Sequence, residues 1–355
     1  MTRTLVVALL TLGDPARLSG GYLYHRRMAE AAPRHAARVE FFSFQERQFP
    51  LATLDAPRLA GQVERSGAHA LVLDSIAAAF MGPWLLARPS RLPLLGMLHQ
   101  PPGGIDFGNV RTAIQAWLDR LAYRRARRLL VASDSLAEQL VREGVPPQRL
   151  RVVPPGRDVS SAAGPPPDDP RLGRRVAFVC VGNWIERKGI HSLLEAVARL
   201  PSDAATLHLV GDDRADPRYA ARLRARLARA DLNGRVVVHG PLPLPGVAAL
   251  YQAADGFVLP SLKEPYGTVY GEAMAAGLPV VGWRAGNLPY LADNEREGLI
   301  VAPGDIQGLA EALGRLAADE ELRQRLGAAA RLRALSRPTW EEAASMFFGA
   351  IREVV

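Results

Sequence analysis

Short apolar runs alternate with longer amphipathic stretches along this chain, and no other feature limits its possible fold as strongly. The apolar runs occupy 5–10, 39–44, 70–73, 94–98 and 129–132 in the first half, and 176–181, 207–210, 236–239, 256–259 and 280–282 in the second. Helical spacing of apolar residues lies between them, for example over 22–32, 113–125, 191–200, 219–230 and 268–276. Strands that alternate with helices favour βαβ units, so we predict an α/β fold with parallel sheets.

A proline-rich stretch interrupts this alternation near the middle of the chain. The sequence Ala-Gly-Pro-Pro-Pro-Asp-Asp-Pro over 163–170 can form neither a helix nor a central strand. The 355 residues leave room for a domain of roughly 150 residues on each side. We predict two doubly wound, Rossmann-like domains over 1–158 and 174–338, joined by a linker over 159–173. Ligands of such sheets bind at the carboxyl ends of the strands, so we expect a site in a cleft shared by the two domains.

Composition excludes several classes of protein. Hydrophobic residues make up 48% of the chain and charged residues 23%, which is typical of a globular protein with a core. No apolar run approaches the roughly 18 residues that a membrane-spanning helix needs, and the first run is too short for a signal peptide. The single cysteine, Cys180, forms no disulfide within the chain, and no cysteine or histidine cluster has zinc-site spacing. We therefore expect a cytoplasmic protein without a structural metal.

Arginines supply nearly all of the positive charge. The formal net charge is +8, and 42 of the 44 basic residues are arginines, which leaves Lys188 and Lys263 as the only lysines. Arginines are densest over 111–128, where six of them accompany one acidic residue, Asp119. A solvated helix in an arginine-rich protein explains this stretch, and so does a surface for an anionic membrane at the inner face of the cell.

The most informative segment covers 260–279, where a strand end, a proline-stiffened loop, a helix and a glycine stop follow one another. A helix that begins near Gly267 or Thr268 leaves its first amide groups free to bind an anion such as a phosphate. Glu264 precedes this helix, and Glu272 lies about one turn into it. A carboxylate accepts hydrogen bonds from two hydroxyls, so each glutamate is suited to grip a sugar or a ribose. Simple capping of a helix by acidic residues is the alternative.

A second segment, over 181–190, runs from a strand through a glycine turn to adjacent cations before a helix. Arg187 and Lys188 are placed where they can neutralise a diphosphate leaving group. His99 follows a buried strand and precedes a loop rich in proline and glycine, which suits a position in a ligand cleft. A hydrogen-bonded structural histidine is the alternative for His99.

These segments resemble the retaining family 4 glycosyltransferases of the GT-B fold. Glu264 and Glu272 reproduce that family's two glutamates separated by seven residues, and an Ala-Met-Ala-x-Gly-x-Pro-Val type continuation follows over 273–280. Further likeness lies at 210–212, 254–255, 298–305 and Trp340, and more thinly at Gly20-Gly21, His99 and 152–158 in the first half. The resemblance implies that the final helix, about 339–355, packs back on an N-terminal, acceptor-binding domain.

The resemblance also implies a role for each candidate residue. Lys188 contacts the donor diphosphate, Glu272 the ribose and Glu264 the transferred sugar, with His99 against that sugar. Gly20 and Gly21 form a loop that faces donor phosphate and acceptor. The remaining donor-binding positions are Gly267, Thr268 and Val269, through their backbone amides, together with Asn183 and Arg187. The family implies no metal and no cofactor besides a UDP- or GDP-sugar donor, and the acceptor is a sugar, lipid or small molecule rather than a nucleic acid.

Three positions depart from the family pattern. Asn183 stands where an arginine is usual, Gly286-Asn287 replaces a Gly-Gly pair, and Tyr290 replaces a glutamate. Because of Asn183, a sugar-nucleotide-binding protein without catalytic power is an alternative function. A GT-B sugar-nucleotide epimerase is another alternative, which shares the two-domain architecture but not this glutamate pair. A dinucleotide-dependent oxidoreductase is disfavoured, because the turn after the first strand lacks Gly-x-Gly-x-x-Gly.

Overall fold

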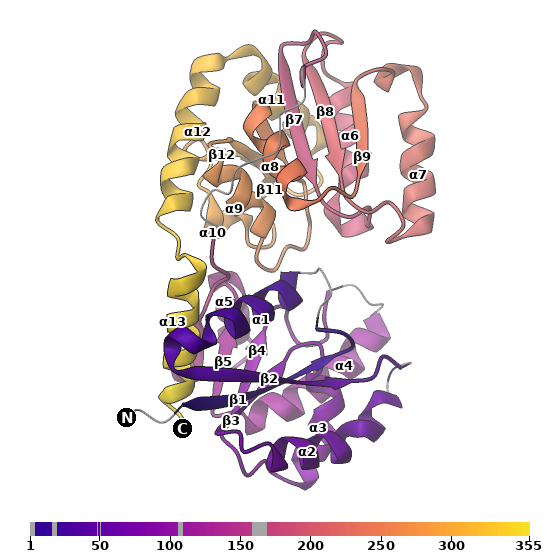
Figure 1. Cartoon of the computed structure of the whole chain (residues 1–355). Coiled ribbons are helices and arrows are strands. Elements are labelled where there is room, and N and C mark those ends of the chain that lie inside the picture. The colour runs from indigo at the N-terminus through magenta and orange to yellow at the C-terminus, as the bar shows by residue number, and fades with distance from the viewer. Residues whose placement is uncertain (1–3, 16–19, 48, 50, 106–108, 158–168) are drawn as a thin grey trace. The chain divides into compact units, whose positions relative to one another are not determined.

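The strands of this protein pair into two parallel sheets, each in its own compact unit (Figure 1). The computed structural model describes the chain except for residues 1–3, 16–19, 48, 50, 106–108 and 158–168. The N-terminal unit contains residues 1–156 and 338–355, and the C-terminal unit contains residues 157–337. The predicted α/β fold with two Rossmann-like sheets is confirmed. Most of the expected linker, 159–173, lies outside the described residues.

The sheet of the N-terminal unit has the strand order β2-β1-β3-β4-β5-β6. Its strands are β1 (Leu5–Leu12), β2 (Ala37–Phe44), β3 (Ala70–Asp74), β4 (Leu94–Leu98), β5 (Arg128–Val131) and β6 (Leu150–Val152). β1 pairs with both β2 and β3, so the direction of chain progression across the sheet reverses at β1. The carboxyl ends of β1 and β3 therefore meet at the switch point where such sheets bind ligands.

Helices cover both faces of this sheet. They are α1 (Gly20–Ala31), α2 (Ala56–Arg65), α3 (Ala78–Ala87), α4 (Asn109–Arg125), α5 (Asp134–Arg142) and α13 (Trp340–Arg352), with short 3₁₀ turns η1 (Ala32–His35), η2 (Leu51–Asp55) and η3 (Pro147–Arg149). Successive side chains of a strand point to opposite faces, so Val7 and Leu9 pack with residues of α1 and α13, whereas Ala8 and Leu10 pack with residues of α2 and α3. The last helix, α13, begins with a capping box between Thr339 and Glu342.

The sheet of the C-terminal unit has the strand order β12-β11-β10-β7-β8-β9. Its strands are β7 (Val176–Val181), β8 (Ala205–Val210), β9 (Val236–Gly240), β10 (Gly256–Val258), β11 (Val280–Trp283) and β12 (Gly298–Val301). After β7, the chain adds β8 and β9 on one side of it and then β10, β11 and β12 on the other side. β7 and β10 are therefore neighbours, and their carboxyl ends form the switch point of this sheet.

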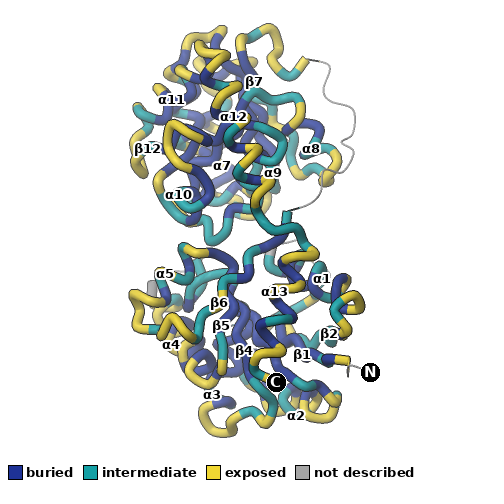
Figure 2. The backbone as a smooth tube through the Cα atoms, turned by 90° about the vertical axis from the view of Figure 1, so that its left-hand side faces the viewer, coloured by how far each residue is buried: buried dark blue, intermediate teal, exposed yellow. Residues whose placement is uncertain are grey.

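The helices of the C-terminal unit pack around that sheet on one continuous core. They are α6 (Ile190–Ala198), α7 (Pro217–Leu227), α8 (Leu244–Ala253), α9 (Thr268–Ala275), α10 (Leu288–Leu291), α11 (Ile306–Ala318) and α12 (Glu320–Leu335), with 3₁₀ turns η4 (Glu186–Lys188) and η5 (Ala230–Leu232). Figure 2 shows the buried residues gathered along the central strands of each unit, with exposed residues on the outer sides of the helices. Cys180 is buried in β7, as a small apolar core residue would be.

Two edge strands, β6 and β12, are the strands that the periodicity did not predict. β6 has three residues and β12 has four, and neither makes a long apolar run. Within the described ranges, none of the helices combines the length and apolar content that crossing a bilayer requires.

Candidate functional site

The predicted donor-site residues lie at the switch point of the C-terminal unit. Gly182 and Asn183 follow β7 directly, and Lys188 belongs to the η4 turn before α6. The loop that carries Glu264 follows β10, the strand beside β7. Gly189 lies where these two segments meet. Its φ of 69° and its closeness to the Pro260 carbonyl exclude a Cβ atom, so glycine is required there. A Cβ on Gly189 would lie 2.1 Å from that oxygen.

Lys188 and Glu264 form an ion pair at the centre of this region. Lys188 Nζ lies 2.5 Å from Glu264 Oε2, and the two side chains are only 11% and 13% exposed. The aliphatic part of Lys188 passes over Gly182, where an added Cβ would lie 3.4 Å from Lys188 Cδ. Sequence reasoning placed Lys188 on phosphate and Glu264 on sugar, and the structure brings the two groups together.

Arg187 points toward the same loop. Its Nη1 donates to the Lys263 carbonyl at 2.8 Å and lies 3.9 Å from Glu264 Oε2. The Arg187 carbonyl in turn accepts hydrogen bonds from the Leu262 amide and the Ser261 hydroxyl. Two cations and one carboxylate are therefore gathered where the loops after β7 and β10 meet.

Gly286 and Asn287 contact the backbone of the loop that carries Glu264. The Asn287 amide donates to the Glu264 carbonyl at 2.8 Å, and its side-chain Nδ2 donates to the Tyr266 carbonyl at 2.7 Å. Gly286 has a φ of 57°, and a Cβ there would lie 2.7 Å from the Glu264 amide nitrogen. The Asn287 side chain, which departs from the family pattern, thus fixes the backbone of the predicted sugar-binding loop.

The helix α9 begins beside Glu264. Its N-cap residue is Gly267, with φ 84° and ψ 47°, and a Cβ on Gly267 would lie 3.4 Å from Glu264 Cγ. Thr268 and Val269 occupy the first helical positions, where amide groups have no carbonyl partner within the helix. These amides and the helix dipole make the start of α9 a suitable place for a phosphate.

Glu272 lies farther along α9, where the Tyr251 hydroxyl donates to its Oε2 at 3.3 Å. Burial of Tyr251 raises the pKa of its hydroxyl well above the usual value, and the neighbouring Glu272 raises it further. The hydroxyl therefore stays protonated and can keep donating to the carboxylate. Tyr251 was not among the residues predicted from the sequence.

Asn183 takes part in the turn rather than adding a charge. Its Oδ1 accepts a hydrogen bond from the Asp212 amide at 3.2 Å, and its carbonyl accepts one from the Ile185 amide. The cation that the family usually has at this position is thus replaced by a neutral side chain that joins the loops after β7 and β8.

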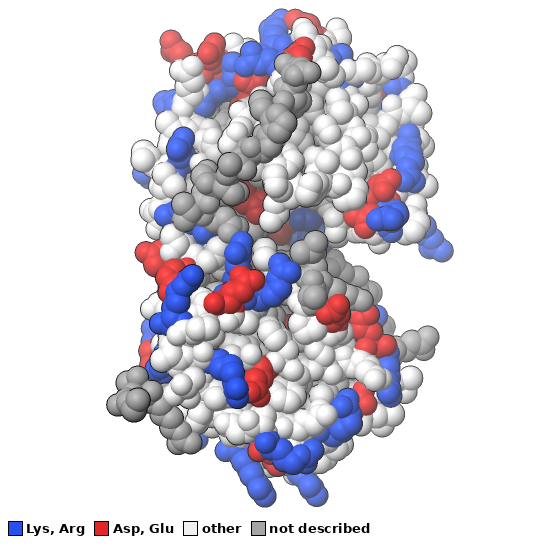
Figure 3. All heavy atoms as spheres, viewed as in Figure 1, with Lys and Arg blue, Asp and Glu red and all other residues white. Residues whose placement is uncertain are grey.

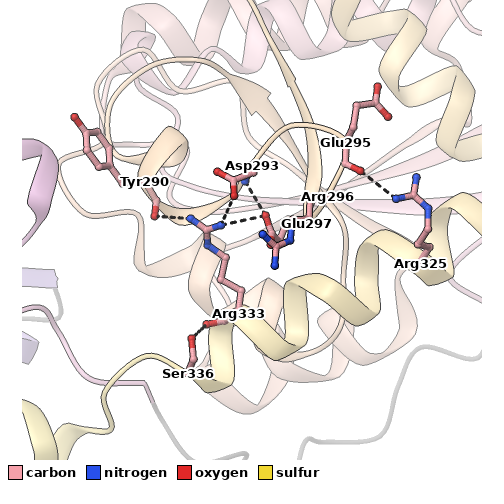
Figure 4. A network of polar contacts seen from close by, with 8 residues as sticks. All are labelled: Tyr290, Asp293, Glu295, Arg296, Glu297, Arg325, Arg333 and Ser336. Atoms are coloured by element: carbon pink, nitrogen blue, oxygen red, sulfur yellow. Dashed lines mark hydrogen bonds and ion pairs between the residues drawn. The ribbon is translucent and has the colours of Figure 1, made fainter.

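Tyr290, the third departure from the family pattern, lies in α10 and belongs to a polar network with α12 (Figure 4). Its carbonyl accepts hydrogen bonds from Arg333 at 3.3 Å and Arg337 at 3.2 Å. Arg333 also contacts Asp293 at 2.7 Å and the buried Glu297 at 3.3 Å. The network anchors the segment after Asn287 to α12.

His99 follows β4 in the N-terminal unit, and its ring packs against α1. The ring centroid of His99 lies 4.9 Å from that of Tyr24 and 4.8 Å from that of His25, both in edge-to-face arrangements. Gly21 lies near the same ring, where an added Cβ would lie 3.4 Å from His99 Cδ2. The expected Gly20-Gly21 loop is wrong for these two residues, because both belong to α1, which begins at Gly20. The predicted residues Gly21 and His99 are therefore neighbours.

Asp74 forms the base of this histidine cluster. Its Oδ2 lies 3.1 Å from His25 Nε2 and accepts a hydrogen bond from the Thr11 hydroxyl at 2.7 Å. Burial alone would raise the pKa of Asp74, but the charge of His25 and the hydrogen bonds outweigh it and lower the pKa to about 2. Burial, followed by the charge of His25, lowers the pKa of His99 to about 3, so His99 is neutral. His25, Asp74 and Thr11 were not predicted from the sequence.

The same cluster is where a metal ion has to be considered. Among the described residues, His25, Asp74 and His99 offer one potential ligand atom each, all within 4.8 Å of one another. A tetrahedral zinc site with bonds of about 2.0–2.1 Å keeps its ligand atoms roughly 3.3–3.4 Å apart. Metal-bound histidines also donate their second ring nitrogen to a partner, whereas His25 Nδ1 is buried without one among the described residues. The cluster fits a direct contact between the His25 ring and the Asp74 carboxylate better than a metal site.

Comparison with known proteins follows the same division of the chain. Residues 2–156 match the glycosyl transferase 4-like domain, and residues 175–319 match glycosyl transferases group 1. D-inositol 3-phosphate glycosyltransferase of Xylanimonas cellulosilytica is 34% identical over 236 residues, which is 61% of this chain and 56% of that protein. The chain spans about half the length of such curated relatives.

Solved structures share the whole fold. Sucrose-phosphate synthase of Thermosynechococcus elongatus superposes with a TM-score of 0.81 at 24% identity, over 98% of each chain. The Anabaena protein HepE in complex with UDP-glucose superposes with a TM-score of 0.78 at 22% identity, over 98% of this chain and 99% of that one. The resemblance seen in the sequence is confirmed, and this chain belongs to the family 4 glycosyltransferases of the GT-B fold.

Proposed function

We propose that this protein is a retaining glycosyltransferase that moves a hexose from a UDP- or GDP-sugar to an acceptor hydroxyl. The observation that carries the proposal is the meeting of Lys188, Arg187 and Glu264 beside the start of α9. Cations and free helix amides suit a diphosphate, and a carboxylate suits sugar hydroxyls. The UDP-glucose complex of HepE, a protein with the same fold, supports a nucleotide-sugar donor.

The main contribution of the protein to the reaction is stabilisation of the leaving diphosphate. The bond between the anomeric carbon and the diphosphate oxygen breaks, and a bond from the acceptor oxygen to the same face of that carbon forms. The acceptor proton passes to the departing diphosphate oxygen. Negative charge grows on the diphosphate during this step, so fixed cations and helix amides lower the barrier.

Each residue has a place in this mechanism. Lys188, Arg187 and the amides of Gly267, Thr268 and Val269 bind the phosphates. Glu272 accepts hydrogen bonds from the ribose, and Glu264 accepts them from the transferred sugar. In the N-terminal unit, His99 meets a hydroxyl of a bound sugar, with Gly20 and Gly21 beside it at the start of α1. No step requires a metal ion.

A protein that binds sugar nucleotides without transferring the sugar is the alternative that Asn183 favours. The family's usual arginine adds a cation to the diphosphate, whereas Asn183 adds none and contacts the Asp212 backbone. Thermal-shift measurements with UDP, GDP, ADP and their sugar derivatives identify the ligand. A ligand at about 100 times its dissociation constant should add roughly 2.7 kcal/mol to the free energy of unfolding. Slow release of nucleoside diphosphate from the sugar nucleotide distinguishes an enzyme from a binder, and a changed sugar epimer indicates an epimerase.

The acceptor belongs to a sugar, a small molecule or a lipid, and a lipid implies contact with an anionic membrane. The arginines that suggested this contact are largely engaged within the N-terminal unit. Arg120 pairs with Glu143 at 2.9 Å, Arg128 pairs with Glu353, and Arg127 donates to the Val354 carbonyl at 2.8 Å. On the face shown in Figure 3, cations are mixed with acidic side chains over both units.

An apolar stripe on α4 supports membrane contact more directly than the arginines do. Val110, Ile114 and Trp117 are 77%, 49% and 60% exposed, and their spacing places them on one side of the helix. Tryptophan is favoured at membrane interfaces. Co-sedimentation with anionic vesicles at low salt should retain the protein, and Trp117→Ala should weaken retention. Wild-type protein that stays in the supernatant points to a water-soluble acceptor.

A further inference from the structure

One nitrogen of the His99 ring has no hydrogen-bond partner among the residues that the structure describes. Nε2 of His99 is buried, and none of the described residues bonds to it. Burial keeps this ring neutral, with its pKa lowered to about 3. A buried polar atom without a partner costs about 1–3 kcal/mol, so a ligand that supplies one gains binding energy there. A hydroxyl group is a suitable partner for a neutral imidazole nitrogen.

Residues in the first two turns of α1 lie against the His99 ring. Gly21, Tyr24 and His25 are three and four residues apart, so they share one side of the helix. Tyr24 and His25 both present their rings edge-to-face to His99, and Gly21 leaves room for its Cδ2 edge. The orientation of His99 therefore depends on side chains of α1.

His25 is itself fixed by groups from two neighbouring strands. Its Nε2 contacts Asp74 Oδ2 at 3.1 Å, at the end of β3, and Asp74 Oδ2 accepts from Thr11 near the end of β1. Asp74 Oδ1 accepts weaker bonds from the Ser75 hydroxyl at 3.3 Å and the Ile76 amide at 3.4 Å. Because Asp74 is held from several sides, it provides a rigid anchor for His25.

We propose that His25, anchored by Asp74, is a positioning residue that sets the His99 ring so that Nε2 meets a substrate hydroxyl. The identity of that substrate as a sugar rests on the proposed function; the positioning itself does not. The contacts run from Asp74, at the end of β3, through His25 on α1 to His99, which follows β4. Thr11, near the end of β1, holds Asp74 in place.

The test compares turnover of His25→Gln, His99→Ala and the double variant with the wild type. Gln keeps a donor for Asp74 but lacks the ring that packs on His99. Release of UDP from UDP-glucose, or from the sugar nucleotide that stabilises the protein most, gives kcat and KM, and calorimetry gives UDP affinity. His35→Gln is the matched control, because His35 lies in η1 and stacks on Phe348 instead. Asp74→Asn serves if His25→Gln does not fold.

The proposal predicts that His25→Gln lowers kcat about 10- to 100-fold, since a small misplacement of the bound substrate can cost this much. UDP affinity should change less than twofold, and His35→Gln should keep full turnover. The double variant should be no slower than His99→Ala, because residues that act as a unit are not additive. Additive losses, or full turnover in His25→Gln, would overturn the proposal.

A second readout does not depend on activity. The ring-nitrogen NMR signals of His99, assigned by their loss in His99→Ala, should shift in His25→Gln and stay unchanged in His35→Gln. Unchanged His99 signals in His25→Gln would contradict positioning, and so would stoichiometric binding of Zn²⁺ that His25→Gln abolishes. If the wild type turns over no sugar nucleotide, the proposed function fails, and the NMR comparison still decides the role of His25.

Discussion

Lys188 Nζ and Glu264 Oε2 lie 2.5 Å apart and join the loops that follow β7 and β10. Both side chains are nearly nine-tenths buried, so neither charge is fully hydrated. Because Lys188 is proposed to bind phosphate and Glu264 to bind the sugar, we expect a donor phosphate to replace the Glu264 carboxylate beside Lys188. The carboxylate thus balances the charge of Lys188 while no donor is bound.

Glu264→Gln should separate phosphate binding from sugar transfer. Loss of the carboxylate frees Lys188, so UDP should bind at least as tightly as to the wild type. Turnover of the sugar nucleotide should fall about 10²- to 10³-fold, since a charged hydrogen bond to the sugar is worth roughly 1.5–3 kcal/mol and its position affects orientation as well. Calorimetry with UDP and a UDP-release assay measure the two effects.

Lys188→Gln is the matched comparison for that variant. It should weaken both UDP binding and turnover, because the remaining Arg187 alone cannot replace the buried ammonium. UDP binding that falls in Glu264→Gln as it does in Lys188→Gln would contradict the division of labour between the two residues.

Glu272→Ala should weaken UDP itself, with no sugar attached. Two ribose hydroxyls that lose a charged acceptor account for about 1.5–3 kcal/mol, or roughly 10- to 100-fold in the dissociation constant. Tyr251→Phe removes the hydroxyl that contacts Glu272 and should have a smaller effect. If UDP affinity does not change in Glu272→Ala, Glu272 does not bind the ribose and only stabilises the helix α9.

Gly286→Ala should disturb the Glu264 loop beyond the ordinary cost of a side chain at positive φ. That cost is about 1–2 kcal/mol, and a Cβ on Gly286 would also lie 2.7 Å from the Glu264 amide nitrogen. Gly304→Ala is the control, since Gly304 has a φ of 82° and open space around it. We expect a larger drop in Tm and loss of turnover for Gly286→Ala only. Equal drops in Tm with turnover intact would show that the loop tolerates the contact.

Asp119 should make stability depend on pH. Its carboxylate accepts from the Gly103 amide at 2.8 Å, but burial raises its pKa from 3.8 to about 7. The folded chain therefore holds this proton more tightly than the unfolded chain, and the stability that it contributes decreases as pH rises from about 4 to 7. At 1.36 kcal/mol per pH unit the contribution is at most about 4 kcal/mol.

Asp119→Asn removes that titration and keeps an oxygen for the Gly103 amide. The fall in Tm from pH 5 to pH 8 should be smaller in this variant than in the wild type. Asp203→Asn, at an exposed carboxylate that is ionised throughout this range, should leave the pH dependence unchanged. A wild-type pH dependence that survives in Asp119→Asn would mean that another group causes it.

Features carried by one stretch of sequence were predictable. The central strands were predicted because each is an apolar run between turn residues, and the pairing of β7 with β10 follows the expected doubly wound order. Lys188 and Glu264 were singled out because each lies in a turn between a strand and a helix. Three- and four-residue edge strands such as β6 and β12 carry too little periodicity to be predicted.

Features that depend on distant residues were not predictable. His25 and Asp74 are 49 positions apart and meet only because α1 packs near the end of β3. The hydrogen bond from Asn287 to the Tyr266 carbonyl likewise joins two loops. A histidine four residues after Gly21, and an aspartate that ends an apolar strand, were the available signals. Neither signal indicates which residue its side chain contacts.

Release of nucleoside diphosphate from a panel of UDP-, GDP- and ADP-sugars tests the central claim most directly, when the wild type is compared with Lys188→Gln. We predict that the wild type releases the diphosphate from at least one sugar nucleotide and leaves the anomeric configuration of the sugar unchanged, and that Lys188→Gln abolishes the release. A wild-type protein that binds the sugar nucleotide but releases nothing, or a Lys188→Gln variant with full activity, would contradict the account.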